Sequence, residues 1–318
     1  MNELTSDSSG STAVTEPGLA VRQLTDSAPD VTRAELIRQR AESDGYLFVS
    51  GLVDVECLNT VRADILAICR AHHFVEPDDD VLVGTAVSGV RWREGDREYF
   101  AAYDEIQRLE SFHRLAHSPR LVALLEALFG SSVLVHPRNI ARVMFPNNNQ
   151  FTTPAHQDYV HIQGTPHTWT AWFPLGDCPR SLGSLEVLPG SHRAGPLPVR
   201  SAYGAGGLGV QTDHLGLQWV GGDFKAGDVL LFHSLTVHRG TPNQTPDRVR
   251  LSVDFRYQSV LEPVTQASLL PHFNRLLWDE IYQGWSPDAP RYYWRELPLT
   301  LVDFSRRFHD AAARGAGS

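Results

Sequence analysis

The stretch Val249-Arg250-Leu251-Ser252-Val253-Asp254-Phe255-Arg256-Tyr257 alternates apolar and polar residues along its whole length. Successive side chains of a β-strand point to opposite faces, so this alternation predicts a strand with one apolar and one polar face. Runs rich in Val, Ile, Trp and Phe, separated by Pro, Gly and Asn, begin after Gly130. The predicted strands are 132–136, 139–145, 156–163, 168–175, 184–188, 217–220, 228–233 and 249–258. Strands in this order favour a jelly roll.

Helical patterns flank this strand-rich region on both sides. Thr32 and Glu35 have the spacing of a capping box, which predicts a helix that runs to about Ser43 and is ended by Gly45. Other segments with helical spacing are 54–71, 99–115, 119–128 and parts of 268–314, and 46–49 reads as a short strand. The sequence therefore predicts a mainly β protein with flanking helices.

The domain organisation follows from the same patterns. The start of the chain is polar and rich in Ser, Thr and Gly, so we expect residues 1–29 to be a disordered tail. Residues 30–318 are expected to form a single domain, with its β core at about 130–260 and a C-terminal helical region at 268–314. Two segments, the irregular stretch 76–97 and the aromatic stretch 278–294, are expected to frame the substrate opening. For the aromatic stretch, plain helix packing is the alternative.

Composition restricts the classes of function. The chain has 318 residues, of which 42% are hydrophobic, and a formal net charge of -9. This charge argues against a nucleic-acid partner, which needs a basic surface, and predicts a neutral or cationic small-molecule substrate. The spacing of Cys57, Cys69 and Cys178 suggests neither a disulfide framework nor a zinc ribbon, and no stretch approaches a membrane span or a signal peptide. We expect a cytoplasmic protein, and we make no prediction of its oligomeric state.

The motif His156-Gln157-Asp158 can supply two metal ligands. Residues i and i+2 of a strand project to the same face and can bind one ion from one side. A surface strand with polar residues outward is an equal alternative for this motif alone. A third ligand is expected from the segment 227–240, which contains His233 and His238. His233 ends an apolar run and is expected to make a structural hydrogen bond, whereas His238 precedes a turn from which it can point into a barrel mouth.

We therefore predict that His156, Asp158 and His238 bind the metal. Two histidines and one carboxylate leave adjacent coordination positions open, which is typical of non-haem iron(II) that binds both a co-substrate and O2. A zinc hydrolase needs only one open position.

The alternating strand offers an anchor for a co-substrate. In most strands the polar face would meet solvent, but inside a barrel the polar face lines the cavity and helices cover the apolar face. Arg250 then presents a planar fork that matches a carboxylate, and Ser252 can donate to the same group. This pair suits the distal carboxylate of 2-oxoglutarate.

Several motifs occur in a specific order along the chain. They are Gly45-Tyr46-Leu47-Phe48-Val49, His156-Gln157-Asp158-Tyr159, Leu188-Pro189-Gly190-Ser191-His192, Gly227-Asp228-Val229-Leu230-Leu231-Phe232 leading to His238, Pro242-Asn243 and the Arg250-Leu251-Ser252 strand. In this combination the chain resembles the phytanoyl-CoA dioxygenase (PhyH-like) family of iron(II)- and 2-oxoglutarate-dependent oxygenases, over about residues 30–258. The resemblance departs at Leu182, where many relatives carry Asn before the glycine. Binding of an acyl-CoA is not supported either, because Lys225 is the single lysine.

The resemblance implies a double-stranded β-helix (jelly-roll, cupin-like) core and the cofactors Fe(II), 2-oxoglutarate and O2. It implies iron ligation by His156, Asp158 and His238 and binding of 2-oxoglutarate by Arg250 and Ser252. By position it also suggests Trp172 and Thr153 as cofactor-pocket residues. Core packing is the alternative for Trp172, and a plain loop threonine is the alternative for Thr153.

The implied activity is oxidation of a C–H bond in a small molecule, by hydroxylation, desaturation or oxidative cyclisation. Halogenating relatives have a small residue where this chain has Asp158, which argues against halogenation. The bacterial-looking sequence suggests a secondary metabolite as substrate. Two alternatives come from other classes: a cupin-type hydrolase or isomerase that uses zinc or manganese without 2-oxoglutarate, and a catalytically silent binding protein that keeps the barrel.

Overall fold

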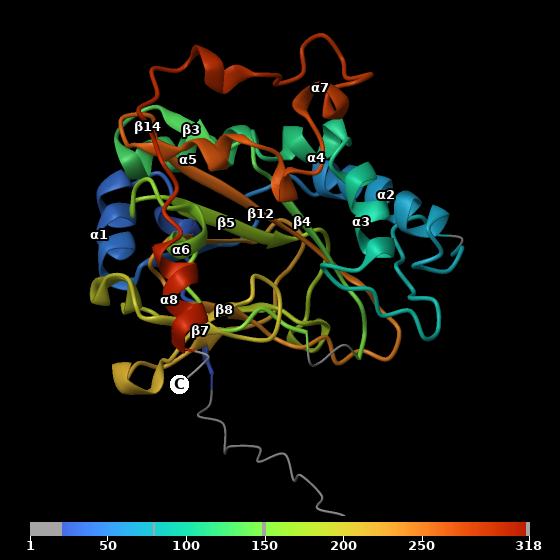
Figure 1. Ribbon diagram of the computed structural model, residues 1–318, viewed down its shortest axis with the longest axis horizontal. Coiled ribbons are helices and arrows are strands. Elements are labelled where there is room, and N and C mark those ends of the chain that lie inside the picture. Colours follow the sequence, from blue (N-terminus) through green and yellow to red (C-terminus); the bar gives the residue numbers. More distant parts are fainter. Residues whose placement is uncertain (1–20, 79, 148–150, 316–318) are drawn as a thin grey trace, which may run out of the picture.

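The structure, a computed structural model, describes residues 21–78, 80–147 and 151–315. Its centre is a six-stranded antiparallel sheet in which β12 pairs with β5, β3 and β4 (Figure 1). In this sheet Asp254 of β12 lies opposite Trp172 of β5, and Arg250 lies opposite Met144 of β4. The strands are β2 (Tyr46–Val49), β10 (Val229–His233), β5 (Trp169–Pro174), β12 (Arg250–Ser259), β3 (Val133–Val135) and β4 (Ile140–Met144).

A second, four-stranded sheet packs against the inner side of the main sheet. Trp172, Leu230 and Phe232 of the main sheet form one buried cluster with Val187 and Val220 of the second sheet. Two short two-stranded sheets complete the β structure. The strands outside the main sheet are β1 (Arg22–Gln23), β9 (Val220–Gly221), β6 (Leu185–Val187), β11 (His238–Gly240), β7 (Val199–Ser201), β8 (Leu208–Val210), β13 (Val264–Thr265) and β14 (Leu301–Val302). The predicted mainly β, jelly-roll fold with flanking helices is confirmed.

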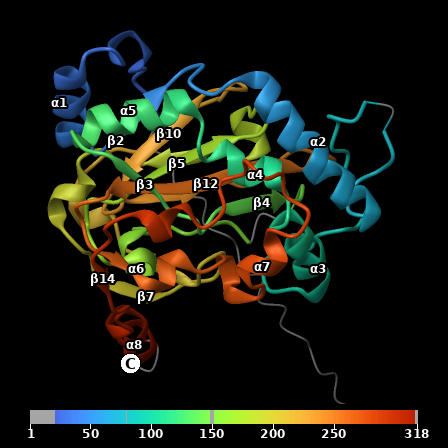
Figure 2. The same cartoon turned by 90° about the horizontal axis from the view of Figure 1, so that it is seen from above.

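Helices cover the outer side of the main sheet. Figure 2 shows α1, α5, α4 and α2 along one side of the sheet, with α6 and β7 on the other. Asp54 caps α2, because its carboxylate accepts hydrogen bonds from the backbone N–H groups of Glu56 and Cys57. The helices are α1 (Ala34–Asp44), α2 (Val55–Ala71), α3 (Arg97–Ile106), α4 (Glu110–Leu115), α5 (Pro119–Phe129), α6 (Tyr159–Ile162), α7 (Trp278–Ile281) and α8 (Arg307–Gly315). Short 3-10 turns occur at Ala28–Asp30, Arg180–Leu182, Ser191–Ala194, Asp213–Leu215, Gln266–Leu269, His272–Asn274 and Tyr293–Glu296.

The two faces of β12 confirm the prediction that helices cover the apolar face of this strand and that its polar face points to the interior. Leu251, Val253 and Phe255 belong to the large core under the helices. Arg250 and Arg256, on the opposite face, are also buried, at 2% and 7% relative exposure. The polar face of this strand therefore lies inside the molecule, where a site can form.

Several local predictions were wrong. The predicted strand 156–163 is instead a bridge residue followed by a turn and the helix α6. Part of the predicted tail 1–29 is structured, because β1 pairs in parallel with β9; residues 1–20 lie outside the described residues. The capping box at Thr32 does not form, since Arg33 is the N-cap residue of α1. Gly45 does end this helix, with a φ of 73°.

The C-terminal region is less helical than predicted. Between 268 and 314 it contains α7, α8, short 3-10 turns and the strand β14. Trp278, Tyr282, Trp285 and Trp294 of the aromatic stretch 278–294 belong to one buried hydrophobic cluster. This agrees with the alternative that these aromatic residues serve packing. No helix in the described part of the chain is long and apolar enough to cross a membrane.

Candidate metal centre

The three predicted metal ligands lie together, but a turn brings His156 and Asp158 to one side. His156 forms an isolated antiparallel bridge with His238, the first residue of β11. Each of the two backbone N–H groups donates to the other residue's carbonyl at 3.0 Å. The chain then turns, and Asp158 occupies the N-cap position of α6. The strand alternation expected for this motif is therefore wrong, although the pair of residues it selected is brought together.

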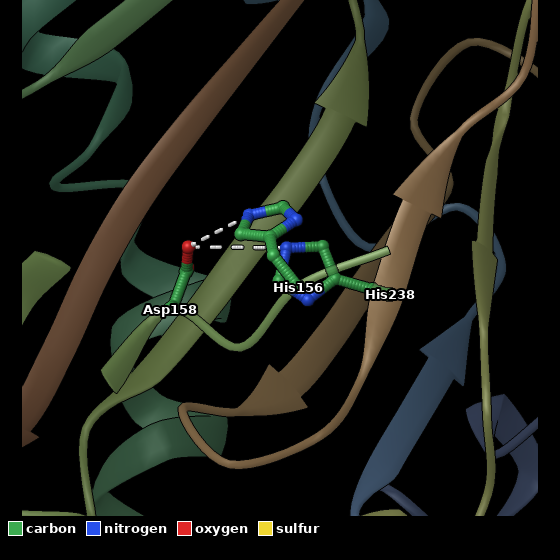
Figure 3. Close-up of side chains that lie close together, drawn as sticks. All are labelled: His156, Asp158 and His238. Atoms are coloured by element: carbon green, nitrogen blue, oxygen red, sulfur yellow. Dashed lines mark ion pairs between the residues drawn. The ribbon is translucent and has the colours of Figure 1, made fainter. Parts of the chain in front are cut away.

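The geometry of the triad suits a metal ion. The candidate ligand atoms of His156, Asp158 and His238 all lie within 4.8 Å of one another, and all three residues are buried. The Oδ1 atom of Asp158 lies 3.5 Å from Nε2 of His156 and 3.8 Å from Nε2 of His238 (Figure 3). The three side chains thus face one common point.

Hydrogen bonds fix which imidazole nitrogen faces that point. Nδ1 of His156 bonds to the carbonyl of Pro154 at 2.8 Å, and Nδ1 of His238 bonds to the carbonyl of Thr236 at 3.0 Å. A carbonyl can only accept, so each Nδ1 carries the hydrogen and donates it. Each Nε2 keeps its lone pair, which is the form of histidine that binds a metal.

The protonation states of the ligands also fit a metal. Burial raises the pKa of the Asp158 carboxyl, but the opposing effects, with the charge of Arg256 as the largest, outweigh it, so this pKa lies well below its usual range. Burial and the neighbouring His156 lower the pKa of His238 to about 3. At neutral pH the site therefore presents a carboxylate and a neutral imidazole, as metal binding requires.

Two further groups hold Asp158 in place. The hydroxyl of Thr170 donates to its Oδ2 at 2.6 Å, and Nη2 of Arg256 lies 3.5 Å from its Oδ1. Sequence reasoning missed both residues as site residues. Arg256 could have been found, since it follows Arg250 and Ser252 in the same alternation. Thr170 offered no signal beyond its place in a predicted strand.

A small cavity joins the triad to the predicted co-substrate anchor. It is lined by His156, Asp158 and His238 together with Arg250, Trp172 and Thr153. Nη1 of Arg250 donates to the carbonyl of Gly183 at 2.8 Å, and its guanidinium lies 5.7 Å from the centre of the Trp172 ring. The structure thus brings six of the seven predicted residues to one cavity.

The seventh predicted residue, Ser252, is buried on the same face of β12 but does not line this cavity. Its Oγ has no hydrogen-bond partner among the described residues. The same is true of Nε of Arg250 and Nε1 of Trp172. Buried polar atoms are nearly always paired, so the unpaired donors of Arg250 and Trp172, which both line the small cavity, fit a ligand with acceptor atoms.

His233, which competed with His238 in the sequence, lies outside the triad. It ends β10, and its Nδ1 accepts a hydrogen bond from the backbone N–H of Leu235 at 3.2 Å. The predicted structural role of His233 is confirmed.

A larger cavity lies beside the triad and adjoins the small one. His156 and Asp158 line it, and so do Arg138, Arg256 and Phe273. Glu94 of the irregular segment 76–97 also lines it, which supports the prediction that this segment borders the substrate opening. No residue of the aromatic stretch 278–294 is among the lining residues that the structure describes.

A jelly-roll core with two histidines and a carboxylate beside a buried cavity defines a non-haem iron oxygenase. Residues 41–251 match the family described as "Phytanoyl-CoA dioxygenase (PhyH)". The chain therefore belongs to the PhyH family of iron(II)- and 2-oxoglutarate-dependent oxygenases, so the cofactors are Fe(II), 2-oxoglutarate and O2.

Known relatives agree with this assignment. The chain is 26% identical over 249 residues to the 1-deoxypentalenic acid 11-beta-hydroxylase of Streptomyces arenae, an alignment that covers 73% of this chain and 84% of the relative. It is also 26% identical over 218 residues to the peroxisomal phytanoyl-CoA dioxygenase of Rattus norvegicus, with 65% and 63% covered.

Solved structures show the same fold. The epimerase SnoN in complex with Fe3+, alpha ketoglutarate and nogalamycin RO has a TM-score of 0.53 at 23% identity, covering 85% of this chain and 96% of that one. The non-heme monooxygenase ThoJ in its apo form has a TM-score of 0.52 at 23% identity, covering 72% and 79%.

Proposed function

We propose that this enzyme oxidises a C–H bond of a small molecule, with His156, Asp158 and His238 as the iron ligands. Arg250 and Ser252 hold the distal carboxylate of 2-oxoglutarate, and Trp172 and Thr153 border the same pocket. The observation that carries the proposal is the set of unpaired buried donors, on Arg250, Ser252 and Trp172, beside a triad whose imidazole lone pairs converge.

The charge and burial of Arg250 support its role. Burial lowers the pKa of the Arg250 guanidinium to about 10, so it remains charged at neutral pH. Among the described residues, no carboxylate lies within 4 Å of it, so it has no ion-pair partner in the protein, and Asp254 of the same cavity is already paired with Arg142. A buried unpaired guanidinium is costly, and a bidentate carboxylate would remove that cost.

When bound, iron(II) and 2-oxoglutarate supply the oxidising chemistry, with O2 as oxidant and succinate and carbon dioxide as co-products. The residues of this chain supply position and environment. Thr170 and Arg256 hold the Asp158 carboxylate, and the hydrogen bonds from each Nδ1 to a backbone carbonyl keep the Nε2 atoms of His156 and His238 directed inward. The burial of the cavity excludes bulk water from the site.

Hydroxylation is the default outcome, because a hydroxylase of a bacterial secondary metabolite is among the relatives. Desaturation and oxidative cyclisation use the same site. Asp158 occupies a metal-ligand position, which leaves no room there for a halide. The same relative supports a secondary metabolite as the proposed substrate class.

The test is calorimetric titration of 2-oxoglutarate into the iron(II)-loaded protein without oxygen. Arg250→Gln should weaken 2-oxoglutarate binding at least about 30-fold, the loss expected for one partner of a buried charge pair. Its iron content should stay at the wild-type value. Arg248→Gln is the matched control, because Arg248 lies two residues away and is half exposed.

Asp158→Ala should lose iron. Retention of iron by this variant, or wild-type affinity for 2-oxoglutarate in Arg250→Gln, would refute the assignment. Succinate release across a panel of polycyclic and sugar-containing metabolites then identifies the substrate. A hydrolase or isomerase would instead turn over without 2-oxoglutarate.

A further inference from the structure

The larger cavity beside the triad is lined by three arginines, Arg138, Arg142 and Arg256. Its lining shares Arg142, Thr153, His156 and Asp158 with the small cavity that holds Arg250. Two residues of the triad therefore border both cavities, whereas Arg250, the proposed anchor for 2-oxoglutarate, lines only the small one. The other cavity is where a substrate can approach the metal.

In the part of the chain that the structure describes, Arg142 is the one of these three arginines that pairs with carboxylates other than a metal ligand. Nε of Arg142 donates to Asp254 at 2.7 Å, and its Nη1 lies 3.5 Å from Glu94. The ion pairs of Arg142 thus link β4 to β12 and to the segment 76–97.

Arg138 has no such partner. Its Nη1 donates to the carbonyl of Ala267 at 2.7 Å, and no carboxylate in the described ranges lies within 4 Å of its guanidinium. Burial, and to a lesser extent the charge of Arg256, lowers the pKa of Arg138 to about 10. The Arg138 guanidinium therefore stays charged at neutral pH.

Among the described residues, Asp158 is the one carboxylate within 4 Å of Arg256, at 3.5 Å, and Nε of Arg256 has no hydrogen-bond partner there. Asp158 is the proposed iron ligand, so a bound divalent ion takes up the negative charge of that carboxylate. Arg142 with its two carboxylates carries one net negative charge, so Arg138 and Arg256 together leave one net positive charge in this group of side chains.

Three histidines that line this cavity, His136, His161 and His272, add no positive charge to it. Burial, with the nearby Arg256 and Arg138, lowers the pKa of His136 to about 3. Burial and His156 lower the pKa of His161 to about 3, and burial with Arg138 holds that of His272 well below its usual range. At neutral pH these rings are neutral, and the positive charge resides on the arginines.

From this arrangement we infer that the substrate carries an anionic group, a carboxylate or a phosphate, which Arg138 and Arg256 bind in the larger cavity beside the metal. The inference rests on the proposed function of the triad. It opposes the expectation from the net charge of -9, which predicts a neutral or cationic substrate. The local charge decides, because in a buried, low-dielectric cavity nearby charges interact far more strongly than charges spread over a solvated surface.

Matched neutral and anionic probes test the inference. The metal-loaded protein with saturating 2-oxoglutarate is titrated calorimetrically with cyclohexanecarboxylate, 2-naphthoate, the primary amide of each, and phenyl phosphate. An oxyanion should bind about tenfold more tightly than its amide, the gain expected for a charge-assisted hydrogen bond. A preference for the carboxylates identifies a carboxylate substrate, and a preference for phenyl phosphate identifies a phosphate.

Variants at Arg138 locate the binding group. Arg138→Gln should lose the preference for the oxyanion while its affinity for 2-oxoglutarate stays at the wild-type value, and Arg138→Lys should keep most of the preference. Arg248→Gln, an exposed control, should behave as wild type. Equal or tighter binding of every neutral probe, or an unchanged preference in Arg138→Gln, would overturn the inference.

The outcome is separable from that of the proposed function. If wild-type protein fails to bind 2-oxoglutarate, the proposed co-substrate role of Arg250 fails. The same titrations repeated without 2-oxoglutarate, in wild type and in Arg138→Gln, still decide whether Arg138 binds an anion.

Discussion

On one face of β12, Leu251, Val253 and Phe255 pack into the large core beneath the helices. On the other face, Arg250 and Ser252 are equally buried but carry polar atoms without partners. Burial alone does not separate a core from a site, since both faces of this strand are excluded from solvent. The two faces differ in their hydrogen bonding. The core face carries apolar side chains that need no hydrogen-bond partner, whereas the site face carries polar atoms that only a ligand can pair.

The largest effect should come from a metal ligand on the site side. His238→Ala should abolish substrate-dependent succinate formation and weaken iron binding by more than about 100-fold, above the range for loss of an outer hydrogen-bond partner. Metal analysis of the purified protein gives the measurement. His233→Gln is the matched control, because His233 ends the neighbouring segment of the chain without joining the triad. Equal iron loss in both variants would mean that the triad is wrongly assigned.

Substitutions of adjacent residues on β12 should separate the two faces directly. Leu251→Ala should lower the free energy of unfolding by about 2–5 kcal/mol, because it leaves a cavity in the core, and should leave the affinity for 2-oxoglutarate unchanged. Ser252→Ala should change that free energy by less than about 1 kcal/mol and weaken 2-oxoglutarate about tenfold. Denaturant unfolding and calorimetry measure the two quantities. The comparison breaks down if both variants lose the same property.

A smaller effect is expected from the support of Asp158. Thr170→Val keeps the shape of the side chain but removes the hydroxyl that donates to Oδ2. Iron affinity should fall about 10- to 100-fold, with the melting temperature of the metal-free protein nearly unchanged. Competition with a chelator measures the affinity. Wild-type iron affinity in this variant would show that Arg256 alone holds the carboxylate.

The smallest effect concerns a polar group on the core side. Burial lowers the pKa of His113 to about 4, while its neighbour Phe112 packs against Phe255 of β12. The unfolded chain binds a proton at His113 below about pH 6.5, and the folded protein does so only near pH 4. The free energy of unfolding that His113 contributes is therefore intact above pH 6.5 and falls as the pH drops toward 4.

Between pH 6 and pH 5 this contribution should fall by about 1 kcal/mol. His113→Gln should lose that much less stability over the same interval, as measured by urea unfolding at each pH. The other buried histidines titrate alike in both proteins, so they cancel in the difference. Identical slopes in the two proteins would show that His113 does not titrate with a lowered pKa.

Much of the fold could be predicted because β12 and the long helices carry clear periodicity. The alternation over 249–257 and the apolar spacing over 54–71 correspond closely to β12 and α2. Strands of three residues, such as Val199–Ser201 and Leu208–Val210, were missed because they are too short to show alternation. The prediction of a strand at the position of α6 is wrong because a helix of four residues is too short to show helical periodicity.

The site was predicted in its residues better than in its geometry. His156 and Asp158 were chosen as neighbours on one strand face, whereas the backbone turns between them. A strand and a turn place the same one-residue spacing between His156 and Asp158, so the sequence motif cannot distinguish them. The turn becomes evident only from the tertiary pairing of His156 with His238. Thr170 and Arg138 carry no local signal, because their roles depend on which segments the barrel brings together.

The backbone bridge between His156 and His238 has a consequence for the order of events during synthesis. The two residues come from distant parts of the chain, and non-local pairings of this kind form late in folding because loop closure must precede them. A nascent chain that has not yet exposed β11 holds at most two of the three ligands, so its hold on iron is weak. The complete set of three ligands therefore exists only once β11 has paired with His156, so we expect tight iron binding to require that pairing.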